Sequence, residues 1–389
     1  MISTPDRRRL SPFMPRMPVE RATVGSRTVT LEEVARLAGV SRSTVSRVLN
    51  GDPRVSDAVR ARVQTVVREH RYHPNAAARS LASRRTRILG LLIPQAVGWI
   101  FSDAFFPTLI QGVAEGCTTA DHDLSLLLDT SGDHRAVDRL YHRVIRGRHV
   151  DGVVVASNLV DDPIVARLQD DRVPSVLIGR DPNGRASFVD VDNRQAARDA
   201  VAHLIGHGRR RIATIAGPTN MIAAIDRFGG YVTALQESGR LPDPALTIHA
   251  DFTRPGGYQA MMALLPHHPD AVFAASDIMA TGALQALREA GLRVPDDVAL
   301  IGFDGLDDDM LAQGALSTVV QPVAELGRQA VRTLLRLVET PERAPIHMLF
   351  PATMVLRGSC GCAGILPLID RRAGEVGAEQ ERIAEVIAS

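Results

Sequence analysis

From residue 87 onward, short unbroken apolar runs alternate with longer amphipathic stretches, and this alternation constrains the fold more than any other feature. The apolar runs have strand length, and the stretches between them have the periodicity of helices. Continuous apolar strands alternating with helices are typical of parallel sheets covered on both faces. The expected strands are 87–94, 124–130, 152–157, 174–179, 211–217, 271–276 and 298–304, and the clearest helices are 193–208, 226–239, 278–291 and 323–339.

The strands 152–157 and 271–276 both follow a helical stretch and end in a serine. This similarity indicates two comparable lobes, each a doubly wound α/β unit. In sheets of this kind ligands bind in a crevice beyond the carboxyl ends of the strands. We therefore expect a small-molecule site in the body of the chain, between the lobes.

Residues 28–74 have a different texture and predict three short helices. Thr30 and Glu33 form a capping-box pattern at the start of the first helix, 31–38, and Gly39 stops it. Ser41 is placed to cap a second helix, 42–49, and Ser56 a third. Two helices joined by so short a turn are typical of the helix-turn-helix, whose second helix enters the major groove of DNA.

The charge of the chain is split along its length. Residues 1–87 contain 18 arginines against 7 acidic residues, whereas residues 88–389 contain 27 against 37, and the chain has no lysine. A basic head on an acidic body favours a polyanionic partner for the head. In the second helix Val45 and Val48 point inward and leave Arg42, Ser43, Ser46 and Arg47 outward, where arginine can grip a guanine edge. A merely solvated helix face is the alternative.

A short segment rich in alanine and arginine, 75–85, follows the three helices. Leu81 is its one large apolar residue, and ten residues form no stable free helix in water. The leucine could wedge between DNA base steps, or it could dock on its own domain within a flexible linker. The residues alone leave these two interpretations evenly balanced.

Several classes of function find no support. No apolar run approaches the roughly 20 residues that cross a bilayer, so we expect a cytoplasmic protein without membrane contact. No nucleophile elbow, P-loop or dinucleotide motif is present, so we expect no enzyme and no cofactor. Cys360 and Cys362 have no second Cys or His pair near them in the sequence, so free thiols are expected rather than a metal or redox site.

Taken together, these segments resemble the lactose-repressor (LacI/GalR) family of bacterial transcription regulators. The resemblance covers residues 28–359. It rests on TLEEVARLAGVSRSTVSRVLN and the residues after it as far as Pro94, then on VDVDN, RIATIAGP, ASDIMATGALQALREAGLRVPDDVALIGFD and VQPVAELGRQAV. It implies an all-α head with a helix-turn-helix (28–74) and a hinge helix (75–86), then a two-lobed α/β sensor domain of the type I periplasmic-binding-protein kind (87–359). A basic leader, 1–27, which we expect to be disordered, and a tail, 360–389, lie outside it.

For the head, the resemblance implies roles position by position. Arg42, Ser43 and Arg47 would read base edges in the major groove. Residues suited to positioning the DNA backbone are Ser41, Thr44 and Ser46. In the hinge, which begins at Asn75, Leu81 would enter the minor groove and Ala78 would let paired hinge helices approach.

For the body, the resemblance implies a sugar-like effector. Arg227 would hold ligand hydroxyls, Asp192 and Asp304 would accept from others, and Phe252 and Phe106 would form walls. Each residue has a structural alternative: Asp192 could cap the helix that Asn193 opens, Asp304 could orient a loop, and the phenylalanines could be core. Asp277 is expected to cap helix 278–291. We expect residues 221–225 to form an apolar loop before Arg227, where relatives often carry polar ligand-binding residues, and this counts against an ordinary polar sugar.

The function implied is that of a transcription regulator, most simply a repressor. It would bind near-palindromic operator DNA as a homodimer, with affinity controlled by the effector. A solute-binding component of a transporter, which would share the sensor fold, is the alternative, and the basic head argues against it.

Overall fold

The computed structural model describes residues 29–49, 51–72, 85–96, 100, 104–129, 138–156, 159–305, 316–340, 343–362 and 366–367. The chain divides into two compact units, residues 1–82 and 83–389, called here the head and the body. The leader 1–27 and the hinge residues Asn75, Ala78 and Leu81 lie outside the described residues, as does most of the tail.

The head contains the three predicted helices, α1 (Leu31–Ala38), α2 (Arg42–Leu49) and α3 (Asp57–Glu69). The capping box is confirmed, because the hydroxyl of Thr30 accepts from the backbone N–H of Glu33 and the Glu33 carboxylate accepts from that of Thr30. Gly39 ends α1 in the left-handed conformation, with φ of 61°. Ser56 precedes α3 as predicted, but among the described contacts its side chain makes no capping hydrogen bond.

Valine dominates the core of the head. Val34, Val45 and Val63 are fully buried, one from each helix. Their positions follow the helical spacing seen in the sequence, so the predicted inward faces are confirmed. So small a core fixes the three helices relative to one another and leaves the outer face of α2 to solvent.

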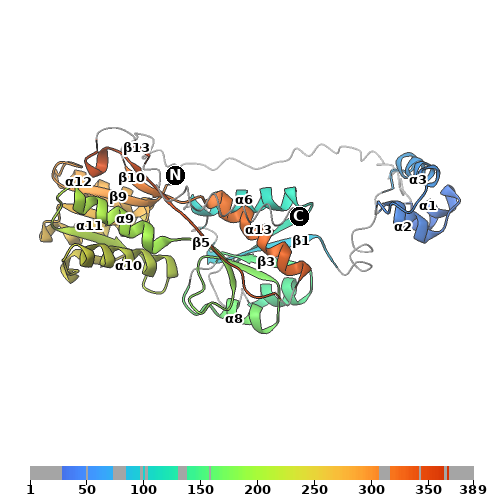
Figure 1. The fold of residues 1–389 in the computed structure, drawn as a ribbon, viewed down its shortest axis with the longest axis horizontal. Coiled ribbons are helices and arrows are strands. Elements are labelled where there is room, and N and C mark those ends of the chain that lie inside the picture. The colour runs from blue at the N-terminus through green and yellow to red at the C-terminus, as the bar shows by residue number, and fades with distance from the viewer. Residues whose placement is uncertain are drawn as a thin grey trace, which may run out of the picture. The chain divides into compact units, whose positions relative to one another are not determined.

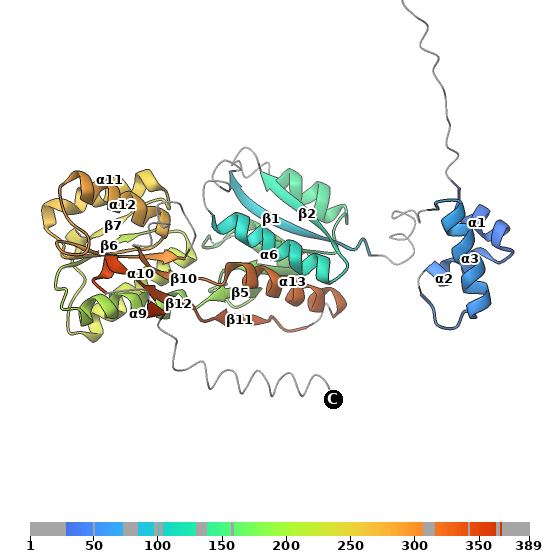
Figure 2. The same cartoon turned by 90° about the horizontal axis from the view of Figure 1, so that it is seen from above.

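The first lobe of the body is built on a six-stranded sheet in which every recorded strand pairing is parallel. Helices α6 (Phe105–Thr119) and α13 (Val323–Glu339) cover one face. The π-helix η1 (Tyr141–Arg146) and α8 (Pro163–Asp170) cover the other (Figures 1 and 2). The strands, in spatial order, are β11 (His347–Phe350), β5 (Ser187–Val191), β4 (Ser175–Ile178), β3 (Gly152–Val155), β1 (Ile88–Ala96) and β2 (Asp123–Asp129).

The second lobe repeats this plan with a seven-stranded sheet. Helices α11 (Arg254–Leu264) and α12 (Asp277–Glu289) pack on one face, and α9 (Asn193–Gly206) and α10 (Ile222–Glu237) on the other. All pairings are parallel except those of β12 with its two neighbours. The strands, in spatial order, are β13 (Leu366–Pro367), β12 (Thr353–Leu356), β10 (Ser317–Val320), β9 (Ala299–Asp304), β8 (Ala271–Ala274), β6 (Ile212–Ala216) and β7 (Thr247–His249).

The chain passes between the lobes three times, after β5, after β10 and after β11. These crossovers place Asn193 and Gln321 at the junction of the lobes. The predicted two-lobed α/β fold is confirmed, and α13 spans the residues expected. We expected the tail to start at 360, yet the second lobe extends further, because Cys360 is buried and β13 pairs with β12. Among the described residues no helix is long and apolar enough to cross a membrane.

Candidate functional site

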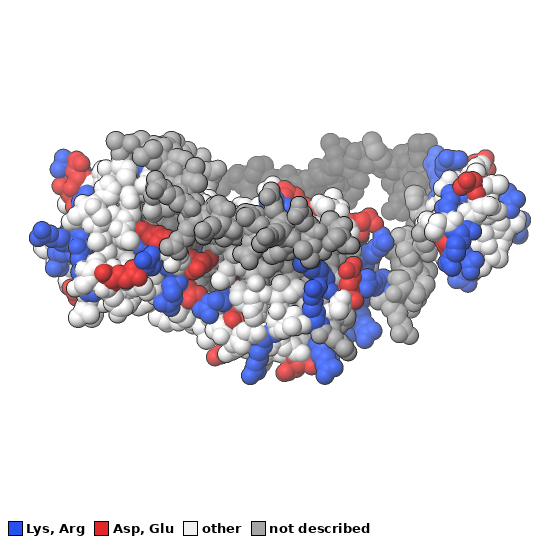
Figure 3. Space-filling view, in the orientation of Figure 1, with Lys and Arg blue, Asp and Glu red and all other residues white. Residues whose placement is uncertain are grey.

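Helix α2 presents a polar face to solvent. Arg42, Ser43 and Arg47 are exposed, whereas Val45 and Val48 are buried. The orientation predicted from the sequence is therefore confirmed, with Ser46 half-buried at the margin. Basic side chains predominate on the visible surface of the head unit (Figure 3).

The start of α2 is held by hydroxyl groups. The Ser41 oxygen lies 2.8 Å from the hydroxyls of Ser43 and Thr44 and accepts from the Thr44 backbone N–H at 3.2 Å. This contact confirms that Ser41 caps α2. The three hydroxyls therefore form one connected group at the helix N-terminus.

Arg42 has a partner that the sequence pattern did not indicate. Its guanidinium lies 3.0 Å from the carboxylate of Glu32 in the first turn of α1, and both side chains remain largely exposed. The two positions are ten residues apart on separate helices, so only the packing of α1 on α2 brings them together. Arg42 is thus paired with an acidic group of the head itself.

In the body, Arg227 on α10 is the most strongly engaged of the predicted effector residues. Its Nε donates to Asn193 Oδ1 at 2.8 Å, and one terminal nitrogen donates to the Ala275 carbonyl at 2.6 Å and to Asp304 Oδ1 at 3.0 Å. The guanidinium also lies over the ring of Phe303, 3.8 Å from its centroid. Arg227 is only 5% exposed, so its charge is balanced inside the protein.

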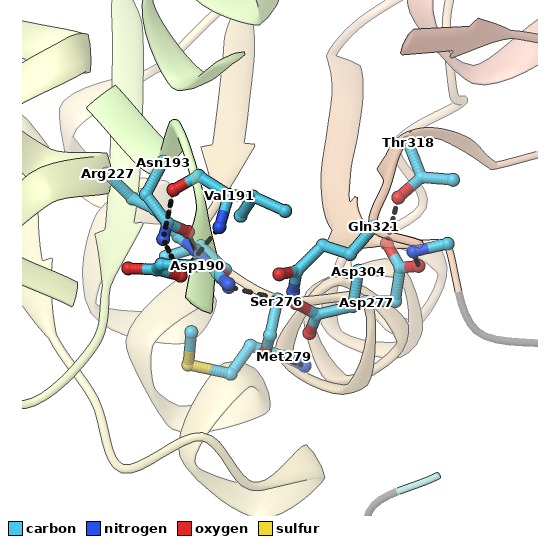
Figure 4. Close-up of polar contacts among 12 residues, drawn as sticks. Asp190, Val191, Asn193, Arg227, Ser276, Asp277, Met279, Asp304, Thr318 and Gln321 are labelled. Atoms are coloured by element: carbon cyan, nitrogen blue, oxygen red, sulfur yellow. Dashed lines mark hydrogen bonds and ion pairs between the residues drawn. The ribbon is translucent and has the colours of Figure 1, made fainter. Parts of the chain in front are cut away.

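Asp304 completes the pair with Arg227 at the carboxyl end of β9. Its Oδ1 also accepts from Gln321 Nε2 at 2.7 Å, and its backbone has a φ of 116°, outside the range that non-glycine residues ordinarily adopt. Figure 4 shows the resulting chain of contacts from Asn193 through Arg227 and Asp304 to Gln321. Because Asn193 follows β5 and Gln321 follows β10, this network joins two of the three connections between the lobes.

Asp190 extends the network into the first lobe. Its carboxylate accepts from the backbone N–H groups of Arg180 and Val191 and from Asn193 Nδ2 at 3.1 Å. Burial raises the pKa of Asp190 to about 6, although the two backbone hydrogen bonds and the charge of Arg227 oppose the shift. The carboxyl group therefore titrates close to neutral pH.

A second ion pair crosses between the lobes beside this network. Arg180, which follows β4, donates from Nε and a terminal nitrogen to the two oxygens of Asp226 on α10, at 3.0 and 2.8 Å. A cavity of about 330 Å³ lies at this junction. It is lined by Arg180, Val191, Asp192, Asn193, Arg194, Asp226 and Leu349.

The other predicted effector residues have structural roles of their own. Asp192 lines the cavity and caps α9 by accepting from Gln195 N–H at 2.9 Å. Helix capping was the alternative role that the sequence indicated for Asp192. Phe252 is 7% exposed and packs against Gly217, where an added Cβ would lie 2.3 Å from the ring. Phe106 is buried in the first lobe, edge-to-face with Phe105.

Two local predictions in the body are corrected. Ser276, not Asp277, caps α12, and the Asp277 carboxylate instead accepts from Gly305 N–H and from the Thr318 hydroxyl. The apolar stretch 221–225 is not a loop, because α10 begins at Ile222 and buries Ile222, Ala223 and Ala224. Their apolar character serves packing in the second lobe.

Sequence reasoning missed Asp190, Arg180, Asp226, Asn193 and Gln321 as parts of the site. The motif VDVDN contains two of them, but only the path of the chain through the crossovers shows which of its polar residues turns inward. Asp190 and Asp192 are two residues apart and would share a face if the strand continued, but β5 ends at Val191, so Asp190 is buried and Asp192 is exposed. Strand alternation therefore could not have separated them.

Both the head and the body match known protein families. A family profile described as bacterial regulatory proteins, lacI family, matches residues 30–75, and one described as a periplasmic binding protein-like domain matches residues 201–360. The HTH-type transcriptional regulator CelR of Thermobifida fusca is 39% identical over 338 residues, 86% of this chain and 98% of CelR. The ribose operon repressor of Escherichia coli K12 is 35% identical, over 85% of this chain and 99% of the repressor.

Solved structures show the same relationship. A CelR–cellobiose complex aligns with a TM-score of 0.66 at 37% identity, over 85% of this chain and 99% of that one. The lac repressor dimer bound to operator and the anti-inducer ONPF aligns with a TM-score of 0.74 at 26% identity, over 86% and 99%. Both alignments extend over the head and the body.

Proposed function

Because the chain belongs to the lacI family of bacterial regulatory proteins, we propose that it represses transcription by binding near-palindromic operator DNA as a homodimer. A sugar-like molecule bound between the lobes of the body controls the affinity for the operator. The observation that carries this proposal is the Arg227–Asp304 pair, set in a network that joins two of the connections between the lobes.

The DNA-binding part of the proposal rests on α2. Arg42, Ser43 and Arg47 project from a helix whose other face is fixed by the valine core, so their side chains are presented on a rigid support. Arginine can hold guanine O6 and N7 with two hydrogen bonds, and short hydroxyls reach phosphates or base edges. Ser41, Thr44 and Ser46 would then position the DNA backbone.

The hinge part of the proposal concerns residues 75–86. Asn75 would open a helix that orders on the operator, Ala78 would face its twin in the dimer, and Leu81 would enter the minor groove. A leucine inserted between base steps kinks the duplex. Replacing Leu81 with alanine should therefore reduce DNA bending, measured by energy transfer between dyes on the two duplex ends; unchanged bending would remove this role.

The effector part of the proposal rests on donor and acceptor chemistry. A hydroxyl group can accept from the Arg227 guanidinium and donate to the Asp304 carboxylate, so adjacent hydroxyls suit this pair. Phe252 and Phe106 would supply apolar walls and Asp192 a further acceptor. The relatives support a sugar, since one is a ribose operon repressor and CelR is found with cellobiose.

Regulation follows from the position of the pair. A sugar that binds between Arg227 and Asp304 would replace their contact, which links Asn193 to Gln321 through hydrogen bonds to both residues. Binding would therefore change the relative free energies of the lobe arrangements. A ligand shifts such an equilibrium only by its difference in affinity for the two arrangements. The arrangement that lets two hinges pair would be the one that binds DNA tightly.

Operator recognition is tested by anisotropy with labelled palindromic and random duplexes at moderate ionic strength. Arg47→Ala should lose about 1–3 kcal/mol of specific binding while binding to random DNA changes far less. Arg68→Ala, an exposed arginine on α3, serves as the control. Equal losses on both duplexes would show that Arg47 contacts only phosphate, and no discrimination by the wild type would overturn the proposal.

The effector is tested by a thermal-shift screen of mono- and disaccharides, followed by operator binding in the presence of each hit. A hit should raise the melting temperature of the wild type and change its operator affinity. Arg227→Lys keeps the charge but loses the fork of donors, so it should abolish the response and leave basal DNA binding intact. A normal response in this variant would exclude Arg227 from the site.

A further inference from the structure

Two histidines and a cysteine meet on the outer side of the second lobe. His203 lies in the last turn of α9, His207 is the residue directly after the end of this helix, and Cys362 follows the short helix η4 (Gly358–Cys360). The Cys362 sulfur is 3.5 Å from Nε2 of both histidines, and the three possible ligand atoms lie within 4.8 Å of one another.

The sequence analysis expected free thiols at this position because no His pair stands near Cys360 and Cys362 in the chain. The structure supplies that pair from 155 residues away, by packing α9 against the segment after β12. The histidines have the i, i+4 spacing that lets two imidazoles on one helix face a common point. Their ring centroids are 4.5 Å apart.

The spacing fits a metal ion. Zinc bonds of about 2.3 Å to sulfur and about 2.0 Å to nitrogen, at a tetrahedral angle, separate the two ligand atoms by about 3.5 Å. Both sulfur–nitrogen distances have this value. Hydrogen bonds give the same distances, since the thiol can donate to one imidazole and accept from the Nε2–H of the other, so metal binding itself has to distinguish the two.

Cys360, two residues before Cys362, has a different partner. It is buried and donates from its sulfur to the Arg357 carbonyl at 3.3 Å, and it is not one of the three residues whose ligand atoms lie within 4.8 Å of one another. Gly361 between the two cysteines has a φ of 98°, which turns the chain sharply at this point. A water molecule would complete a tetrahedron around an ion held by His203, His207 and Cys362.

We propose that His203, His207 and Cys362 bind a zinc-like divalent ion, with a water molecule in the fourth position. Nitrogen and thiolate ligands select zinc over magnesium or calcium, and the cluster found among the described residues contains no carboxylate. The ion would join the end of α9 to the last strands of the lobe and so stabilise the folded body.

The test uses the full chain, reduced and freed of metal with a chelator. Zinc is titrated against a chromophoric competitor, and cobalt is added separately to record the ultraviolet band of a thiolate–cobalt bond. One ion per chain, the thiolate band and a higher melting temperature with zinc are expected. His207→Ala and Cys362→Ser should each weaken zinc binding at least tenfold, and Cys362→Ser should remove the band or greatly reduce it.

The control is His267→Ala, an exposed histidine of the same lobe, which should bind zinc as the wild type does. Because His207 is exposed, its replacement should leave the fold intact, which far-ultraviolet circular dichroism checks. The proposal is overturned if the wild type binds zinc no more tightly than the His207 and Cys362 variants, or if cobalt gives no thiolate band. A Cys360–Cys362 disulfide persisting under reduction would overturn it as well.

Discussion

Arginines in the head and in the body are used in opposite ways. The Arg42 side chain on α2 is 68% exposed and pairs with the exposed carboxylate of Glu32, whereas that of Arg227 on α10 is 6% exposed and bonds to Asn193, Ala275 and Asp304. An exposed arginine costs the fold little and is available to a polyanion. A buried one is part of the structure until a ligand competes for its partners.

This difference separates function from stability. Replacing an exposed residue of α2 should change DNA binding and leave the free energy of unfolding nearly unchanged. Replacing a residue of the buried network should change both, because its partners remain buried without their hydrogen bonds. The predictions below test this contrast, from the largest expected effect to the smallest.

Arg227→Ala should have the largest effect. It leaves the Asp304 carboxylate, the Asn193 amide and the Ala275 carbonyl short of a donor in a buried site. Removing one partner of a buried ion pair costs about 3–5 kcal/mol. Denaturant unfolding of the body measures the loss, and Arg47→Ala, expected within about 0.5 kcal/mol of the wild type, is the comparison.

A loss below about 1 kcal/mol for Arg227→Ala would contradict the contrast. It would mean that the network relaxes freely once the guanidinium is gone.

Features that depend on residues close together in the sequence could be predicted, whereas contacts between distant residues could not. The Thr30–Glu33 capping box and the length of α13 depend on neighbours within a few turns, and both were predicted. Arg227 and Asp304 were each singled out, but their contact joins positions 77 residues apart and depends on how β9 and α10 pack. Local patterns do not contain that information.

Asp190 should give the next largest effect, through pH. Its pKa is raised to about 6 in the folded protein by burial, above the ordinary value of 3.8. The folded state therefore keeps this proton where the unfolded state loses it, and the contribution of Asp190 to stability falls as pH rises from about 4 to about 6. The total fall is roughly 2–3 kcal/mol.

Asp190→Asn removes this titration. The difference in unfolding free energy between the wild type and this variant, measured by denaturant at pH 4 and pH 7, should change by that amount. A difference independent of pH would show that Asp190 titrates alike in both states. Because other carboxylates of the body have lowered pKa values and act in the opposite direction, only the difference between the proteins is informative.

Arg180→Gln tests the ion pair across the lobes and should have a smaller effect. Arg180 is one-third exposed, and the Asp226 carboxylate keeps Arg194 at 4.0 Å. The loss of lobe–lobe attraction should therefore be about 1 kcal/mol. A ligand that favours separated lobes should bind a few times more tightly to this variant than to the wild type, and a ligand that favours closed lobes should bind more weakly. If every sugar that binds has the same affinity for both proteins, the ion pair has no part in the lobe equilibrium.

Glu32→Gln should have the smallest effect and tests the ion pair between Glu32 and Arg42. The substitution frees Arg42 and removes a negative charge from the face expected to meet DNA. An exposed ion pair is worth about 0–1 kcal/mol, so operator affinity should rise no more than about fivefold. Glu33→Gln is a matched control, because it removes the same charge from the same helical turn, and glutamine can still serve in the capping box.

If Arg42 is restrained by Glu32, only Glu32→Gln should strengthen specific binding. Equal gains in affinity from both variants would assign the effect to net charge. The contact between α1 and α2 would then have no influence on recognition.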